Sequence, residues 1–352
     1  MAEPAFVESD DALIEVHDIR KHFDVSKPWL VRQLEGAPRT VLKAVDGVSF
    51  SIKPGETFSL VGESGCGKST VAKLVVGLYP ASGGSIRFAG QAFSVAESRR
   101  ALAPLRRRLQ MVFQDPYASL NPRWRVRDII AEPIKAYGLL ETATDIRERV
   151  GRLLEQVGLS AADGAKYPHE FSGGQRQRIS IARALSSDPE FIVCDEPTSA
   201  LDVSVQAQIL NLMKDLQRRL KLTYLFISHD MAVVYHVSDR IGVMYLGRLC
   251  EIADARALFA TPRHPYTQLL LDTIPDLDMT GRERAPVRGE VPNPINPPSG
   301  CAFHPRCPFA DDRCRAESPI LRPVGGSEVA CHAVEEGRIN PLDGAAPPPA
   351  GT

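Results

Sequence analysis

The stretch TFSLVGESGCGKST, residues Thr57–Thr70, decides the fold. Its first five residues are a short apolar run, which predicts a buried strand, and Ser69–Gly77 continues with the apolar spacing of a helix. Between the two lies the pattern Gly62-x-x-x-x-Gly67-Lys68-Ser69. A glycine-rich turn that joins a strand to a helix presents backbone N–H groups and a positive helix end to phosphate. The sequence therefore predicts a phosphate-binding loop rather than a chance glycine-rich turn.

Individual residues of this loop have expected tasks. Lys68 would reach the β- and γ-phosphates of a nucleotide, and the Ser69 hydroxyl would bind Mg²⁺. Thr70 is placed to meet the α-phosphate, whereas Cys66 contributes mainly its backbone and is assigned no chemistry. The predicted nucleotide-binding residues of the loop are Gly62, Glu63, Ser64, Gly65, Cys66, Gly67, Lys68, Ser69 and Thr70.

Two carboxylates follow a second apolar run, FIVC, which predicts another buried strand. Asp195 ends this strand, and the carboxyl edge of a parallel sheet is where such folds bind ligands. Asp195 is expected to hold Mg²⁺ through water, and the adjacent Glu196 to polarise the attacking water. Acidic residues at strand ends are often only solvated caps, but the nearby phosphate loop favours the functional interpretation.

The segment FSGGQ, Phe171–Gln175, begins a second strong helix, Gln175–Ser186, and so supplies a second anion-binding helix end. One nucleotide does not easily bind at both helix ends. Two chains packed head to tail would place each phosphate loop against the other chain's segment. Alone, the segment would be interpreted as an ordinary helix cap. The residues predicted to act across the dimer are Ser172, Gly173, Gly174, Gln175 and, in the following segment SALD, Asp202.

Two further polar residues follow predicted strands. Gln114 comes just after Leu109–Phe113 and is expected to sense Mg²⁺, as a ligand, and the attacking water. His229 follows the run Tyr224–Ile227 and could hydrogen-bond the γ-phosphate. A lone histidine after a strand is usually structural, so only its place in this series of motifs supports a catalytic role.

The composition of the chain limits the classes of protein to which it could belong. The 352 residues are 43% hydrophobic, enough for a buried core, and the formal net charge of −1 disfavours a nucleic-acid-binding protein. The basic run Arg106–Arg108 is better explained as part of a solvated helix. No apolar stretch is long enough to span a bilayer, and the acidic start MAEPAFVESDD does not look like a signal peptide, so we expect a cytoplasmic protein recruited by a membrane partner.

The remaining segments are less regular. Leu13–Val25 and Val41–Ile52 predict strands, and the basic stretch between them, to Thr40, is expected to be irregular. Beyond about Pro275 the composition shifts to Pro, Gly, Arg and Cys, which indicates a small accessory module. Four cysteines in it could bind zinc or an iron–sulfur cluster, or could be free or oxidised thiols: Cys301, Cys307, Cys314 and Cys331.

Taken together, these motifs resemble those of the ATP-binding subunits of ABC transporters, over essentially Leu13–Cys331. The resemblance implies an α/β fold, a P-loop ABC-type nucleotide-binding domain, and hydrolysis of ATP with Mg²⁺. It makes Glu196, His229 and Gln114 catalytic residues, and it places Phe23 where the family stacks an aromatic ring on adenine. It also implies a helical insertion of about Asp115–Ser172.

The resemblance sharpens to the oligopeptide/dipeptide permease ATPases, and to the second of their two ATPase subunits. It rests on QDPYASLNPR (Gln114–Arg123), RHPYTQLLL (Arg263–Leu271) and GCAFHPRCPFA (Gly300–Ala310). The family implies a sister ATPase subunit, two transmembrane permease subunits, and an extracytoplasmic binding protein that acts indirectly. It places the chain on the cytoplasmic face of the cell membrane, and relatives with this cysteine arrangement are thought to bind a [4Fe–4S] cluster.

The resulting prediction is an ATP-driven importer subunit for di- or oligopeptides, whose ATP-dependent closure and reopening drive transport. Alternatives are a nickel-chelate or glutathione importer of the same family and, less favoured, an exporter or a soluble ABC ATPase acting on nucleic acid. The predicted organisation is an ATPase domain over residues 11–260, a cysteine-bearing C-terminal extension over residues 261–339, and a disordered tail over residues 340–352.

Overall fold

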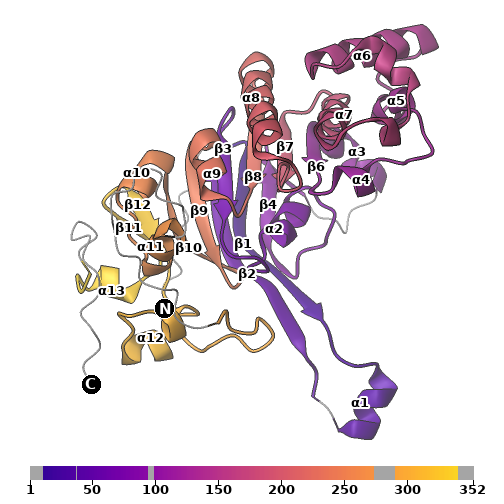
Figure 1. Ribbon diagram of the computed structural model, residues 1–352. Coiled ribbons are helices and arrows are strands. Elements are labelled where there is room, and N and C mark those ends of the chain that lie inside the picture. The colour runs from indigo at the N-terminus through magenta and orange to yellow at the C-terminus, as the bar shows by residue number, and fades with distance from the viewer. Residues whose placement is uncertain (1–10, 37, 94–98, 273–289, 340–352) are drawn as a thin grey trace.

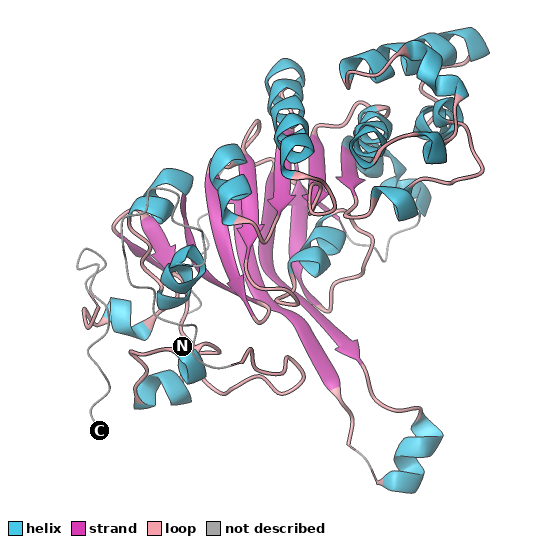
Figure 2. Cartoon of the chain, viewed as in Figure 1, coloured by secondary structure: helices cyan, strands magenta, loops and turns pink. Residues whose placement is uncertain are grey.

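The computed structural model describes residues 11–36, 38–93, 99–272 and 290–339, with the side chains of residues 99–101 left out. The tail predicted over residues 340–352 lies outside this range. The described chain is built from two sheets with helices against them (Figure 1), and Figure 2 separates helices from strands by colour. This mixed α/β architecture agrees with the predicted fold class.

The larger sheet positions most of the polar residues singled out in the sequence. In spatial order its described strands are β11 (Arg322–Val324), β12 (Ser327–Val329), β10 (Arg248–Asp254), β9 (Arg240–Tyr245), β3 (Thr57–Val61), β8 (Thr223–Ile227), β7 (Phe191–Asp195) and β6 (Leu109–Val112). The run from β9 to β6 is parallel. All residues of β3, β7 and β8 are buried, which explains their mostly apolar sequence. The strands expected there are confirmed to within one residue.

The smaller sheet is antiparallel and packs against the larger one. Its described strands are, in spatial order, β2 (Val41–Ile52), β1 (Ile14–Asp24), β4 (Gly83–Phe88) and β5 (Gln91–Phe93). Phe50 of β2 and Phe58 of β3 stack with ring centroids 4.9 Å apart. The helix α2 (Lys68–Val75), which follows β3, packs its buried face, including Val71 and Val75, into the same core. One apolar core therefore fixes the helix that follows the glycine-rich loop.

The segment between β1 and β2 differs from the prediction. Instead of an irregular stretch, residues Trp29–Glu35 form the helix α1 at the tip of a long hairpin arm (Figure 1). Leucine, arginine, glutamine and glutamate in this segment have high helix propensity, and Gly36 ends the helix in the left-handed conformation, at φ 61°. None of the residues of this helix of about two turns is buried, so its support is local rather than from core packing.

A layer of helices lies beside the β6 edge of the sheet (Figure 1). Between β6 and β7 it contains α4 (Pro116–Ser119), α5 (Val126–Ala136), α6 (Ala143–Gln156), short 3₁₀ turns at Ala161–Ala165 and Pro168–Glu170, and α7 (Gly173–Leu185). These helices share an apolar core with α8 (Val203–Leu220), the helix after β7. The helical character expected for the insertion is thus present, although its domain limits stay a prediction.

The C-terminal residues extend the larger sheet. Strand β12 pairs antiparallel with β10, with Glu251 opposite Val329, and β11 pairs with β12. The other described elements here are α10 (Ala255–Ala260), α11 (Pro265–Asp272), the 3₁₀ turn η3 (His304–Arg306), α12 (Asp312–Ala316) and α13 (His332–Glu335). The limits predicted for a separate extension remain a prediction. No helix among the described residues is long and apolar enough to cross a membrane.

A candidate ATP-hydrolysing site

The glycines of the loop after β3 are required by close backbone contacts. Gly62 has φ 151° and Gly67 has φ 107°, conformations that residues with a side chain rarely adopt. A Cβ atom on Gly62 would lie 2.1 Å from the carbonyl oxygen of Met244, and one on Gly67 would lie 2.2 Å from that of Ala44. The loop therefore packs tightly against its neighbours, and only glycine fits at these two positions.

Lys68 lies at the start of α2 and closes the loop. Its ammonium group is buried and donates hydrogen bonds to the carbonyl oxygens of Gly62, at 2.7 Å, and Glu63, at 3.0 Å. The Lys68 nitrogen is also 3.6 Å from the sulfur of Cys66, and burial raises the pKa of the Cys66 thiol. A cationic group and a helix N-terminus thus converge on one short loop, which is the arrangement that binds phosphate.

The next residue joins the loop to β7. The Ser69 hydroxyl donates a hydrogen bond of 2.8 Å to the carboxylate of Asp195, the last residue of β7. Asp195 is buried, and this burial raises its pKa because the charged carboxylate is poorly solvated. Hydroxyl and carboxylate oxygens are hard donors of the kind that Mg²⁺ prefers, and Mg²⁺ is commonly held by only one or two carboxylates together with substrate phosphates. This donor set fits the predicted Mg²⁺ site.

Glu196 is the centre of a second group of polar side chains. Gln114, just beyond β6, donates through its amide to one Glu196 oxygen at 2.9 Å, and the His229 ring nitrogen Nδ1 lies 3.2 Å from the other. The backbone of Glu196 is itself in the left-handed region, at φ 46°. Three strands that are far apart in the sequence therefore bring these side chains together at one edge of the sheet, as the sequence predicted for parallel strands.

The FSGGQ segment forms the start of α7. Ser172 and Gln175 cap the helix reciprocally: the Gln175 side chain accepts from the Ser172 N–H at 3.0 Å, and the Ser172 hydroxyl accepts from the Gln175 N–H at 3.4 Å. Both residues are exposed, as is Asp202 at the start of α8. A Cβ atom on Gly174 would lie 2.4 Å from the side chain of Val205, so this glycine lets the two helices approach each other, while Gly173 is only half-buried.

Phe23 lies in β1 and is half-buried. Its ring makes an edge contact with Tyr79, at 5.8 Å between centroids, and the Lys21 ammonium lies 5.0 Å from the Phe23 ring. Tyr79 follows the C-terminal end of α2, whereas the glycine-rich loop precedes its N-terminal end. The structure thus pairs Phe23 with Tyr79, at the end of α2 away from the glycine-rich loop. Stacking of Phe23 on adenine stays a prediction.

Two contacts of the loop were not foreseen from the sequence. Arg306, in η3, forms an ion pair with the Glu63 side chain, and Tyr266, in α11, accepts a hydrogen bond from the Glu63 backbone N–H. Both residues belong to segments whose sequence pointed only to a family resemblance. The histidine, proline and cysteine residues around them gave no local signal of a contact with a loop some 200 residues away. A buried arginine needs an acidic partner, but the sequence does not show that Arg306 is buried.

The prediction of a [4Fe–4S] cluster is wrong, and a zinc site at the same cysteines is no better supported. Within residues 11–36, 38–93, 99–272 and 290–339, no three His, Cys, Asp or Glu side chains form a group that could hold a metal ion. The cysteines are free, and they line apolar clusters, Cys301 and Cys307 near Phe303 and Cys331 near Val334. Burial raises the pKa of Cys307 to about 12 and that of Cys331 to about 11, so both side chains are neutral thiols in this apolar surrounding.

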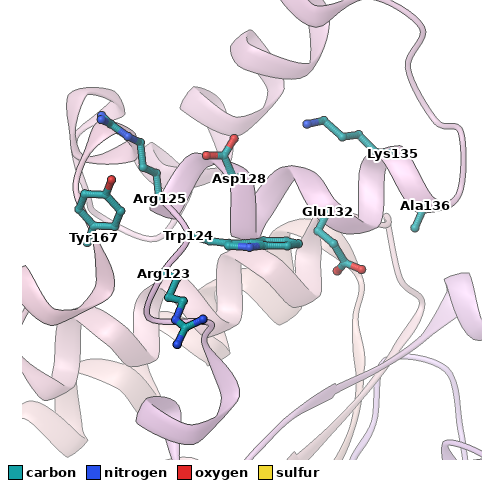
Figure 3. Close-up of a pocket in the computed structure, with 8 residues that line it drawn as sticks. All are labelled: Arg123, Trp124, Arg125, Asp128, Glu132, Lys135, Ala136 and Tyr167. Carbon is teal, nitrogen blue, oxygen red and sulfur yellow. The ribbon is translucent and has the colours of Figure 1, made fainter.

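A groove of about 670 Å³ opens on the helical layer (Figure 3). Its lining combines cations, anions and two aromatic rings, all from α5 and the segments before it and before α7: Arg123, Trp124, Arg125, Asp128, Glu132, Lys135, Ala136 and Tyr167. Trp124 remains 44% exposed. Tryptophan, tyrosine and arginine side chains, which line this groove, are enriched in protein–protein interfaces.

Comparison with known proteins identifies the family. The family model described as ABC transporter matches residues 45–199, and the one for the oligopeptide/dipeptide transporter C-terminal region matches residues 250–314. The oligopeptide transport ATP-binding protein AppF of Bacillus subtilis is 48% identical and spans 92% of this chain and 98% of AppF. The di/tripeptide transport ATP-binding protein DppF of Pseudomonas aeruginosa is 46% identical over 93% of this chain and 99% of DppF.

A solved structure supports the same conclusion. The dimeric ATP-binding cassette MJ0796, in a post-hydrolysis state bound to ADP and Pi, superposes with a TM-score of 0.60 at 26% identity, covering 69% of this chain and 99% of that one. The fold, the phosphate loop and the sequence relationship agree. This chain therefore belongs to the ATP-binding subunits of the oligopeptide/dipeptide ABC transporter family, a family of ABC-type ATPases.

Proposed function

We propose that this chain hydrolyses ATP to power the import of di- or oligopeptides through a membrane permease. The observation that carries the ATPase part is the arrangement of Glu196, held by Gln114 and His229, beside the Ser69–Asp195 pair. Peptides are the favoured cargo because the relatives are described as oligopeptide and di/tripeptide transport proteins. Nickel chelates and glutathione have no comparable support.

In the proposed site the loop residues 62–70 bind the phosphates of ATP. Lys68 exchanges its carbonyl partners for phosphate oxygens, and the loop N–H groups and the start of α2 supply further positive charge. Ser69 and Asp195 would hold Mg²⁺, which neutralises charge on the phosphates when bound. Thr70 meets the α-phosphate.

Hydrolysis is assigned to the group around Glu196. Its carboxylate polarises the attacking water, Gln114 orients that water and senses Mg²⁺, and His229 hydrogen-bonds the γ-phosphate. The 3.2 Å contact between His229 Nδ1 and the Glu196 carboxylate suits this division of labour, because it holds both side chains where the β7 and β8 strands end.

His229→Ala is expected to lower ATP turnover by about 100-fold, within the range found for one positioned acid–base or charge-stabilising group. ATP binding should change little, because Lys68 and the loop remain intact. The control is His236→Ala, since His236 is exposed on α9 (Met231–Val237), seven residues further along the chain. Phosphate release by the assembled transporter measures both variants. Equal turnover in His229→Ala and the wild type would remove His229 from the mechanism.

A second ATPase subunit completes the site in this proposal. The start of α7, where Ser172 and Gln175 are exposed and Gly173 and Gly174 lie between them, would face the phosphate loop of a sister subunit, and the exposed Asp202 would lie at the same interface. The solved relative MJ0796 is described as a dimer. ATP would close the pair and hydrolysis would reopen it. A heterodimer is preferred because the family resemblance implies two different ATPase subunits.

The groove on the helical layer is the proposed docking site for the two permease subunits (Figure 3). It lies on the insertion that begins just after Gln114, so movement at the ATP site would be passed to the membrane subunits. The chain would be a peripheral protein on the cytoplasmic face of the membrane, and the extracytoplasmic binding protein would act only through the permease.

The run Arg106–Arg108 supports no nucleic-acid site, since these side chains bond to Gly77, Ser187 and Glu190.

Trp124→Ala is expected to lower peptide uptake by about tenfold or more while leaving ATP binding unchanged, because exposed aromatic residues often dominate protein interfaces. Tyr235→Ala is the matched control, since Tyr235 is an exposed aromatic residue of α9 outside the groove. Co-purification with the permease subunits and uptake of labelled peptide measure the effect. Normal assembly and uptake in Trp124→Ala would exclude this groove as the docking site.

The cargo is tested in cells that lack the gene for this chain. Uptake of labelled dipeptide, tripeptide, longer peptide and nickel chelate is measured before and after the gene is restored. We expect restored uptake of one or more peptides and unchanged nickel uptake. Restoration of nickel uptake alone, or of none of the peptides, would contradict the proposed cargo while leaving the ATPase assignment to its own tests.

A further inference from the structure

Every polar group of Glu63, the second residue of the phosphate loop, has a partner. Its carboxylate accepts two hydrogen bonds from the Arg306 guanidinium, at 2.7 and 2.9 Å. Its backbone N–H donates to the Tyr266 hydroxyl at 2.9 Å, and its carbonyl oxygen accepts from the Lys68 ammonium at 3.0 Å. Glu63 therefore connects Lys68 directly to two residues of the C-terminal part of the chain.

Both C-terminal partners are held rigidly. The Arg306 side chain is only 2% exposed and lies among the rings of Tyr245 and Phe303. Its hydrogen bonds to the Glu63 carboxylate raise the pKa of the guanidinium, which therefore stays charged. Tyr266 is fully buried and packs against the same two rings. A paired, forked guanidinium fixes a carboxylate in both position and orientation.

The turn that carries Tyr266 is itself anchored to the larger sheet. The buried carboxylate of Glu251, in β10, accepts hydrogen bonds from the backbone N–H groups of Arg263, at 3.0 Å, and His264, at 2.9 Å. The His264 ring nitrogen Nδ1 then accepts from the Tyr266 N–H at 3.0 Å. The hydroxyl that meets the loop is thus fixed through a chain of short contacts to β10.

We propose that Arg306 and Tyr266 are positioning residues of the ATP site, which hold the phosphate loop in its binding conformation before ATP arrives. This inference rests on the proposed ATPase function and assigns Glu63 as the anchor of the loop. Neither Arg306 nor Tyr266 contacts the phosphates; both act through Glu63, whose carbonyl oxygen holds Lys68 within the loop until phosphate oxygens replace that contact. The C-terminal segment thereby becomes part of the nucleotide site.

The physical reason is the composition of the loop. Gly62, Gly65 and Gly67 have many backbone conformations available, and ordering them on binding would cost conformational entropy. An anchor between the first two of these glycines lowers that cost because the loop is ordered in advance. Once ATP is bound, its own phosphate contacts hold the loop, so the anchor should affect ATP affinity far more than the rate of hydrolysis.

Arg306→Ala is expected to weaken binding of the fluorescent nucleotide mant-ATP to the full-length protein about tenfold, as the loop becomes less often binding-competent. In the assembled transporter the KM for ATP should rise by a similar factor, with kcat within about twofold of the wild type. The mant-ATP affinity of Arg306→Lys should lie between those of the wild type and Arg306→Ala, because an ammonium group keeps the charge but lacks the two parallel donors of a guanidinium. Tyr266→Phe, which removes only the hydroxyl, should weaken binding by a few-fold.

Two comparisons separate positioning from general stability. Arg313→Ala is the matched control, because Arg313 pairs with Glu317, Glu335 and Glu336 in the same C-terminal segment and does not contact the loop. It should leave mant-ATP affinity unchanged. Glu63→Ala should lose as much affinity as Arg306→Ala, and the double variant should lose no more than either, since both remove one contact.

The proposal is overturned if Arg306→Ala binds mant-ATP as the wild type does, if Arg313→Ala loses the same affinity, or if kcat falls while KM is unchanged. Additive losses in the double variant would also overturn it. If Arg306→Ala fails to fold, wild-type affinity in both Arg306→Lys and Tyr266→Phe has the same meaning. Failure of the wild-type protein to bind mant-ATP would instead refute the proposed function.

Discussion

Glu196→Gln is expected to slow ATP hydrolysis by about 1,000-fold, because the amide that replaces the carboxylate cannot accept a proton from the attacking water. The substitution keeps the shape of the side chain and can still accept a hydrogen bond from Gln114, so ATP binding should persist. Since hydrolysis is the step that reopens the pair of subunits, ATP should hold the variant in the closed dimer. Phosphate release and the oligomeric state with ATP present measure these effects.

The control for this variant is Glu190→Gln. Glu190 precedes β7 by one residue and pairs with Arg108 near the surface, where an ion pair contributes little free energy. Its turnover should match that of the wild type. Normal hydrolysis by Glu196→Gln, assembled with its partners, would exclude Glu196 as the catalytic carboxylate, whereas loss of ATP binding would mean that the substitution disturbs the loop instead.

Lys68→Ala is expected to weaken ATP binding by about 10- to 100-fold, because one charge-assisted hydrogen bond contributes roughly 1.5–3 kcal/mol. The variant also removes the hydrogen bonds that Lys68 donates to the carbonyl oxygens of Gly62 and Glu63, so the loop without ATP loses two internal contacts. Equilibrium titration with mant-ATP measures the change. The two variants should therefore differ, because Glu196→Gln keeps its ATP affinity but turns over very slowly, whereas Lys68→Ala binds ATP more weakly.

Lys214→Ala is the matched control for Lys68→Ala. Lys214 lies on α8, and its ammonium group bonds to the His236 carbonyl oxygen. Its removal should leave nucleotide affinity unchanged. Wild-type affinity in Lys68→Ala would show that this lysine does not contact phosphate and would contradict the assigned geometry of the loop.

The central part of the fold could be predicted because its signals are local or follow from strand order. A buried strand, a glycine-rich turn and a helix are adjacent in Thr57–Val75, so their geometry is encoded in one short stretch. Gln114, Glu196 and His229 come from different regions, but each follows a strand of one parallel sheet, and such strands end at the same edge. The contacts among these side chains follow from that rule.

Other features depend on contacts that no local pattern reveals. Arg306 looks like one of many basic residues in its segment, and only the folded chain brings it to Glu63. The four C-terminal cysteines suggested metal ligands from their clustering in sequence, yet in the fold Cys301, Cys307 and Cys331 pack into apolar clusters. The helix at Trp29–Glu35 was not predicted, because the helix propensity of so short a segment is hard to recognise from its composition alone.

The most direct test of the account is peptide-dependent ATP hydrolysis by the complete transporter. The chain would be reconstituted into vesicles with its sister subunit, the two permease subunits and the binding protein, and phosphate release and uptake of labelled peptide would be measured together. We predict that peptide stimulates hydrolysis and that both hydrolysis and uptake disappear with Glu196→Gln. Uptake that continues unchanged in the complex containing Glu196→Gln would contradict the claim that hydrolysis by this chain powers peptide import.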